Sequence, residues 1–186
     1  MKSLLGKLGV ILLFISLFAI FLSCSDGKLA KENAELRAKN EELNKQLNEL
    51  KSKTENQSKQ LIKEAVAALK KVEARLQVGI SYQDYTKLLG ETLYQVNLFL
   101  ESSESIQKPE LTASIKRVLS HYREGQSLWN WRLISGTSYF RENDPLWPRI
   151  VSLYPGAKRD DIDYTIQLIW KEANEELKKT INLLPQ

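Results

Sequence analysis

Three features of this sequence carry side chains that could do chemistry: one cysteine, one histidine and a short acidic run. The single thiol, Cys24, excludes an internal disulfide and a cysteine-rich metal site. The single histidine, His121, has no acid spaced to orient it as a base, so we interpret it as structural. The run DDID (160–163) lacks the spaced oxygen ligands of a calcium loop and is typical of a helix N-terminus.

No motif of a known reaction or cofactor site occurs in the chain. A nucleophile elbow, a dinucleotide fingerprint and a zinc signature are all missing from the sequence. We therefore predict no catalytic residue, no metal and no cofactor, with an enzyme kept as a remote alternative that a cleft with perturbed ionisable groups would support. The formal net charge is +4, to which Lys2 and Lys7 contribute two, and this is too weak to predict a nucleic-acid partner.

The thiol lies directly after an apolar run. Lys2 and Lys7 precede the apolar residues 10–22, and the small or polar residues SCSDG follow them. A charged start, an apolar stretch and small residues at its end predict an export signal of bacterial type. The alternative is a transmembrane anchor, although this uninterrupted run is shorter than the roughly 20 residues that a membrane span needs.

The residues FLSC, from Phe21 to Cys24, resemble the lipobox of bacterial lipoproteins. Ser23 fits the small position before the cysteine, whereas Phe21 and Leu22 depart from the usual residues, as though the leucine were displaced by one. The resemblance covers residues 1–24 only and implies a processing class rather than a fold. The alternative for Cys24 is an unmodified residue near an ordinary cleavage site.

The resemblance has consequences for modification and location. It implies a diacylglyceryl thioether on Cys24, cleavage between Ser23 and Cys24, and acylation of the new amino terminus with a fatty acid such as palmitate. Two or more acyl chains hold a protein stably on a membrane. The chain would then be a lipid-anchored protein of the bacterial cell envelope, facing outside the cytoplasm in the periplasm or at the cell surface.

Residues 24–58 are predicted to form a linker and a coiled-coil stalk. Strong helix formers fill residues 28–57, and no Pro or Gly interrupts them. A leucine recurs every seven residues at the heptad position d, with mainly Asn and Leu at position a; the predicted core is Leu29, Asn33, Leu36, Asn40, Leu43, Leu47 and Leu50. This pattern favours a parallel homodimer or trimer through residues 28–57. The alternative is a single helix that acts as a spacer.

Residues 59–186 are predicted to fold as an antiparallel bundle of about four helices, so the fold class is all-α. Apolar residues recur at helical spacing over 61–76, 85–100, 111–133 and 162–181. Gly79, Ser81 and Pro109 suit helix ends and starts. We interpret 109–133 as one helix despite Gly125, and we expect Trp129 and Leu133 on its apolar face. The residues ESSESIQKPE are expected to form an interhelical turn.

The connection 135–159 is long and rich in aromatic residues. Its composition is too apolar for a free linker. One interpretation is a lid packed over an end of the bundle. The other is a surface for a partner or a ligand, for which the candidate residues are Trp129, Trp131, Tyr139, Phe140, Trp147 and Tyr154.

The sequence therefore predicts a removed signal peptide (1–23), an anchored stalk (24–58) and a helical domain (59–186). The function that fits this organisation is a structural or protein-interaction role in the cell envelope, with an unidentified envelope protein as partner. The alternative is a ligand-binding or carrier module that uses the aromatic loop at the bundle end. We predict no nucleic-acid partner.

Overall fold

A computed structural model describes the backbone of residues 2–184 and the side chains of residues 27–184. It confirms the all-α class, with six helices over the described residues. The side chains of Ser23 and Cys24, and with them the predicted signal peptide and lipidation site, lie outside the described side chains.

The chain divides into two units, Met1–Thr54 and Glu55–Gln186. The first unit is part of α1 (Lys2–Val78). The second contains the end of α1 and five further helices: α2 (Tyr82–Leu100), α3 (Ser103–Gln107), α4 (Pro109–Ser135), α5 (Trp147–Leu153) and α6 (Ile162–Asn182).

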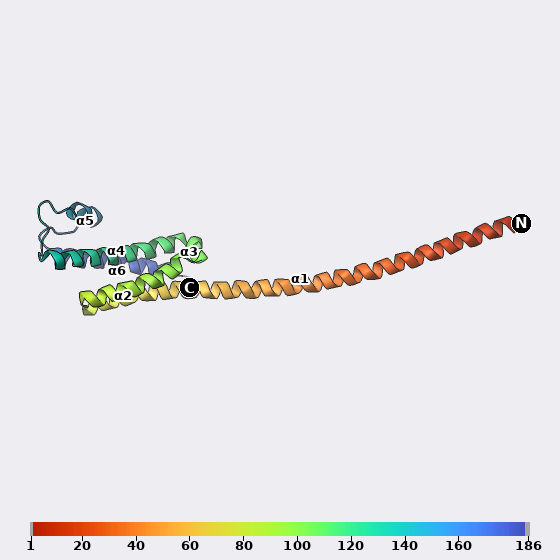
Figure 1. Cartoon of the computed structure of the whole chain (residues 1–186), viewed down its shortest axis with the longest axis horizontal. Helices are drawn as coiled ribbons and strands as arrows, with labels where there is room; N and C mark the ends of the chain where they lie inside the picture. The colour runs from red at the N-terminus through yellow and green to blue at the C-terminus, as the bar shows by residue number, and fades with distance from the viewer. Residues whose placement is uncertain (1, 185–186) are drawn as a thin grey trace. The chain divides into compact units, whose positions relative to one another are not determined.

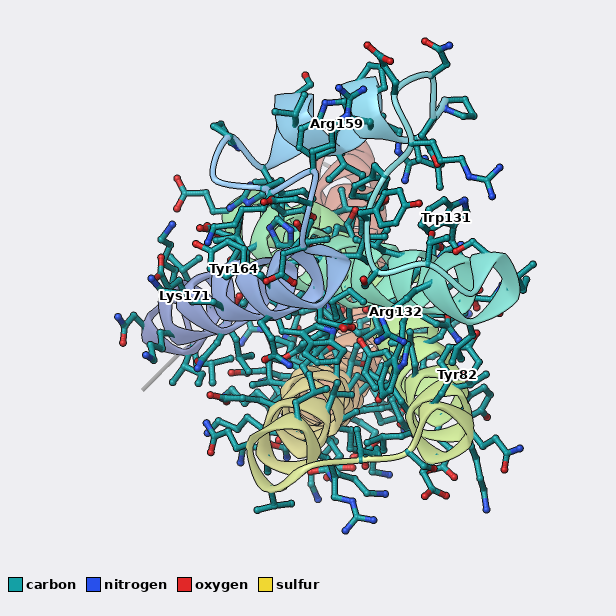
Figure 2. The ribbon with its side chains drawn as sticks, turned by 90° about the vertical axis from the view of Figure 1, so that its left-hand side faces the viewer. Tyr82, Trp131, Arg132, Arg159, Tyr164 and Lys171 are labelled. Atoms are coloured by element: carbon teal, nitrogen blue, oxygen red, sulfur yellow. The ribbon has the colours of Figure 1, made fainter. Side chains whose placement is uncertain are left out.

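The four long helices of the second unit lie side by side, each antiparallel to the next (Figure 1). Seen along their axes, the end of α1 and α2 form one layer and α4 and α6 form another (Figure 2). α5 lies on the far side of α4 and α6, so these two helices are covered on both faces.

Local sequence signals set the helix ends. After α1, Gly79 adopts a positive φ of 88°, which costs a glycine little, and reverses the chain. The Ser81 hydroxyl accepts a hydrogen bond from the Asp84 backbone N–H at 3.1 Å and caps α2. The Asp161 carboxylate accepts one from the Tyr164 N–H at 2.8 Å and caps α6, as the acidic run predicts. Pro109 begins α4.

The predicted apolar stripes form the core between the two layers. Its buried members are Ile62, Ala65, Val66, Leu69, Val72, Tyr85, Leu88, Leu89, Val96, Phe99, Leu111, Ile115, Val118, Leu119, Tyr122, Ala173 and Leu177. Thr92 lies among them, where its hydroxyl donates to the Leu88 carbonyl at 2.8 Å and so is satisfied inside α2.

Two details of the sequence interpretation are wrong. Leu133 is exposed, and Leu128 is buried in its place, because α4 extends past the turn between α1 and α2 (Figure 1) and its last turns pack against other partners. The residues read as a simple turn, 101–110, contain the short helix α3, whose Ser105 hydroxyl donates to the Leu100 and Ser102 carbonyls at 2.8 Å.

A buried polar cluster joins α4 to α6. One carboxylate oxygen of Glu176 accepts hydrogen bonds from the Ser114 hydroxyl and from Arg117 Nε, both at 2.8 Å. Lys179 Nζ lies 3.3 Å from the other oxygen. Burial alone raises the pKa of Glu176, but these hydrogen bonds and the Arg117 charge together lower it below its usual value.

We predict that Glu176→Gln lowers the free energy of unfolding by about 1–3 kcal/mol at neutral pH, because it removes a buried, hydrogen-bonded charge. Since the pKa of Glu176 is lowered by folding, its contribution is complete above the pKa of the unfolded chain, near 4.5, and is lost as the pH falls through the lower folded value. Urea unfolding between pH 3 and 7 measures this. The control is Glu175→Gln, at a half-exposed neighbour; an equal effect of both variants would contradict the assignment.

Candidate functional site

A cluster of four aromatic rings lies where α2, α4 and α6 meet. The Tyr85 ring has its centroid 5.6 Å from that of Trp170 and 5.8 Å from that of Trp129. The two indoles are 5.4 Å apart in an edge-to-face contact, and Tyr82 meets Trp129 at 5.5 Å. Such contacts stabilise a core beyond the area that they bury.

Hydrogen bonds connect this aromatic cluster to the backbone. Trp170 Nε1 donates to the Tyr85 hydroxyl at 3.2 Å, and that hydroxyl donates to the Tyr122 carbonyl at 2.9 Å. Burial raises the pKa of Tyr85 above its usual range, so the hydroxyl stays protonated and serves as donor and acceptor. One chain of hydrogen bonds therefore links all three helices.

Gly125 gives Trp170 the space it occupies. A Cβ at Gly125 would lie 2.5 Å from Trp170 Nε1 and 3.0 Å from Cδ1, closer than atoms approach without displacement. Gly125 is therefore required by packing between α4 and α6, although glycine weakens a helix locally. From the sequence alone, Gly125 is recognised only as a residue of low helix propensity.

We predict opposite effects of the same substitution at two glycines. Gly125→Ala should lower the free energy of unfolding by about 1–3 kcal/mol, because the new methyl group displaces the Trp170 indole. Gly90→Ala, at an exposed position of α2 with open space around it, should raise it by up to about 1 kcal/mol. Denaturant unfolding followed by tryptophan fluorescence measures both. A stabilising Gly125→Ala would contradict the packing described.

The segment 136–161, here called the lid, folds over α4 and α6. Its two ends are joined by backbone hydrogen bonds, from Phe140 N–H to the Arg159 carbonyl at 2.8 Å and from Ile162 N–H to the Ser138 carbonyl at 2.9 Å. Phe140, Ile150 and Tyr154 are buried in a second core cluster. Leu128 of α4 and Ile162, Ile166 and Ile169 of α6 complete that cluster.

Aromatic rings fix the lid to the end of α4. Phe140 stacks on Trp131 at 5.3 Å, and Trp147 lies against Phe140 at 5.2 Å. The Arg159 guanidinium lies 5.8 Å from the Trp147 ring, within the range of a cation–π contact. Figure 2 shows Trp131 and Arg159 on the lid side of the α4–α6 layer.

Two polar contacts hold the other side of the lid to α4. His121 Nδ1 lies 2.8 Å from the Tyr154 hydroxyl, and Glu124 pairs with Arg149. Burial lowers the pKa of His121, although the carboxylates of Glu172 and Glu176 oppose this, so the ring is neutral near pH 7. The hydrogen-bond partner of this histidine is the Tyr154 phenol, and the contact joins α4 to the lid.

The six aromatic residues considered as one partner or ligand surface do not share a location. Trp129 belongs to the cluster around Trp170; Trp131, Phe140 and Trp147 pack the lid on α4; and Tyr154 contacts His121. Tyr139 alone among them is exposed. Most of this aromatic surface is therefore used within the domain, in the manner of a packed lid.

A groove of about 390 Å³ remains open between α4 and α5. Its apolar lining residues are Leu128, Trp131, Ile134, Leu146 and Ile150, and its polar lining residues are Glu124, Ser127, Asn130, Ser135 and Arg149. A second groove of about 440 Å³ runs between α2 and α4 and shares Glu124, Ser127 and Arg149 with the first. Lys116 and Arg123 also line it.

Residues 27–54 of the predicted stalk lie outside the core. Every residue from 27 to 54 is exposed. The heptad leucines are between 47% and 62% exposed: Leu29, Leu36, Leu43, Leu47 and Leu50. Asn33 and Asn40, at the predicted heptad position a, are exposed as well.

The acidic run holds no ion-binding arrangement. Asp161 caps α6, and Asp163 pairs with Arg132, whose Nε lies 2.6 Å from its carboxylate. Among the described residues, no three histidine, cysteine or acidic side chains come together in a way that could hold a metal ion. In the same part of the chain, no helix is both long enough and apolar enough to cross a membrane.

This chain matches no known protein family, no curated protein and no solved structure.

Proposed function

We propose that this chain is a lipid-anchored protein of the bacterial cell envelope that presents a helical domain on a stalk, in a structural or protein-interaction role. The observation that carries the proposal is the exposure of every residue from 27 to 54, a segment that begins three residues after the lipobox-like FLSC. A helix segment that buries nothing adds no core to the fold. Its contribution is length, about 42 Å at 1.5 Å per residue, and a surface for other chains.

The order of the segments supports this role. Along the chain, Cys24 precedes the exposed residues 27–54, and the residues that form a core, from Glu55 onward, follow them. The helical domain needs no ligand to complete its core, since α2, α4, α6 and the lid bury their apolar faces on one another. Such a chain can display its outer surfaces to an envelope partner.

We predict that the wild-type chain, expressed in a bacterial host, sediments with membranes and is released by detergent but not by high salt. Cys24→Ala should remain uncleaved, because the acceptor of the diacylglyceryl group is lost, and its apparent mass should rise by that of the signal segment. Ser25→Ala, one residue further on, is the matched control and should be processed normally. Normal cleavage and membrane association of Cys24→Ala would contradict the proposal.

A second function, ligand carriage, is supported by the open groove between α4 and α5. Five apolar side chains line it, together with the Glu124–Arg149 pair. This chemistry suits a small apolar or amphipathic molecule. Ile134 lines the groove and is 78% exposed, so it is available to a ligand and contributes little to the core.

If the groove carries a ligand, an apolar fluorescent probe such as 1-anilinonaphthalene-8-sulfonate should bind saturably. Ile134→Asp should then weaken binding about tenfold, since it replaces an apolar contact worth about 1.5 kcal/mol with a charge. Leu133→Asp is the matched control, because Leu133 is also exposed but does not line the groove. No saturation, or equal loss in both variants, would exclude carriage at this groove.

A further inference from the structure

The exposed leucines of the stalk form one apolar seam. Leu29, Leu36, Leu43 and Leu50 recur at seven-residue spacing, and Leu47 fills the gap between the last two. Each is about half exposed or more. Single exposed leucines are common on protein surfaces, whereas a continuous line of them marks a contact surface.

Hydrogen bonds within the helix stabilise it and leave this seam uncovered. Gln46 Nε2 donates to the Glu42 carboxylate at 2.9 Å, and the Thr54 hydroxyl donates to the Leu50 carbonyl at 2.9 Å. These bonds stay within one helix at i, i+4 spacing and stabilise its polar surface and backbone. The apolar seam is left for another chain.

We propose that a second copy of this chain covers the seam, in a parallel two-stranded coiled coil with identical residues facing each other. Asn33 and Asn40 occupy successive a positions in the seam. Opposed asparagine side chains can hydrogen-bond to each other across a parallel dimer, and a buried asparagine at position a favours two strands over three. The identity of the partner follows from this self-complementarity.

Other alignments leave at least one asparagine of each chain without an asparagine partner. In the antiparallel alignment that overlaps the whole seam, Asn33 would face Leu50 and Asn40 would face Leu43. A parallel pair shifted by one heptad would place Asn40 opposite Leu47. Each of these alignments buries an asparagine amide against a leucine, and a buried amide without a hydrogen-bond partner destabilises the pair. Only the in-register parallel pair matches both asparagines.

The flanking charges agree with the parallel pair. Glu32 at position g would face Arg37 at position e of the other copy, with opposite charges. The next two such pairs are Lys39 with Asn44 and Gln46 with Lys51, and neither opposes like charges. The charge pattern therefore permits this pairing along the seam.

The seam from Leu29 to Leu50 spans only about three heptads, and two of its core layers are asparagines, so the pairing is weak for free chains. The inference rests on the proposed function in one respect, because anchoring at one surface raises the effective concentration of the stalks and aligns them in parallel. It names the partner of the stalk, which the display role leaves open.

Disulfide trapping of the full-length chain in native membranes tests the proposal. Leu43→Cys, at position d, should give a reducible species of twice the chain mass on mild oxidation, since d residues of a parallel pair approach within disulfide range. Lys45→Cys, on the outer face two residues away, is the matched control and should give at least fivefold less. Equal yields from the two variants, or none from Leu43→Cys, would overturn the proposal.

Orientation and copy number have their own readouts. To test orientation, Leu36→Cys and Leu47→Cys are placed in chains of two different lengths that are expressed together. In a parallel pair, disulfides should join two copies of the same variant, and few should join the two variants to each other. Disulfides mainly between the two variants would indicate an antiparallel pair and overturn the proposal. The wild-type chain extracted in mild detergent should have twice the mass of one chain. The disulfide-trapped Leu43→Cys species provides the reference mass. A threefold mass would contradict a dimer.

The outcomes separate this inference from the proposed function. Acylated Cys24 in chains that never trap through Leu43→Cys would leave the anchor standing and overturn the dimer. A soluble chain with a bare Cys24 that still traps more through Leu43→Cys than through Lys45→Cys would support the dimer and overturn the anchor. Unchanged tryptophan fluorescence of reduced Leu43→Cys shows that the helical domain is intact in either case.

Discussion

The indole of Trp170 occupies the space that Gly125 leaves open on α4, and this contact sets how closely α4 and α6 approach. The same indole donates to Tyr85, which in turn donates to the backbone of α4, so the position of α2 depends on it as well. The lid rests on the outer face of the same two helices (Figure 2). A change in the spacing of α4 and α6 would therefore disturb the core, the lid and the groove together.

The two units of the chain deal with apolar surface in different ways. From Glu55 onward, apolar stripes face one another and the aromatic residues of the lid close the outer face. From residue 27 to 54 nothing is buried, and the leucines remain exposed. One unit is complete within a single chain, and the other has apolar side chains without an intramolecular cover. A role in presenting the complete unit to partners is consistent with this difference.

Periodicity and end signals predicted the helices, because apolar spacing and caps such as Ser81 and Asp161 act over a few residues. The requirement for Gly125 could not be predicted, since helix propensity contains no information about Trp170, forty-five residues away in the sequence. Two other features likewise depend on where the lid and the end of α4 lie: the contact of His121 with Tyr154, and the burial of Leu128 rather than Leu133. Tertiary contacts, not local patterns, decide which aromatic residue belongs to which cluster.

Our proposal that lipid on the single cysteine holds this chain at a membrane can be tested by measuring the intact mass of the protein purified from membranes. We expect a chain that begins at Cys24 and carries the additional mass of a diacylglyceryl group and an amide-linked fatty acid. An unmodified chain that begins at Met1 or at a residue after the apolar run would contradict it.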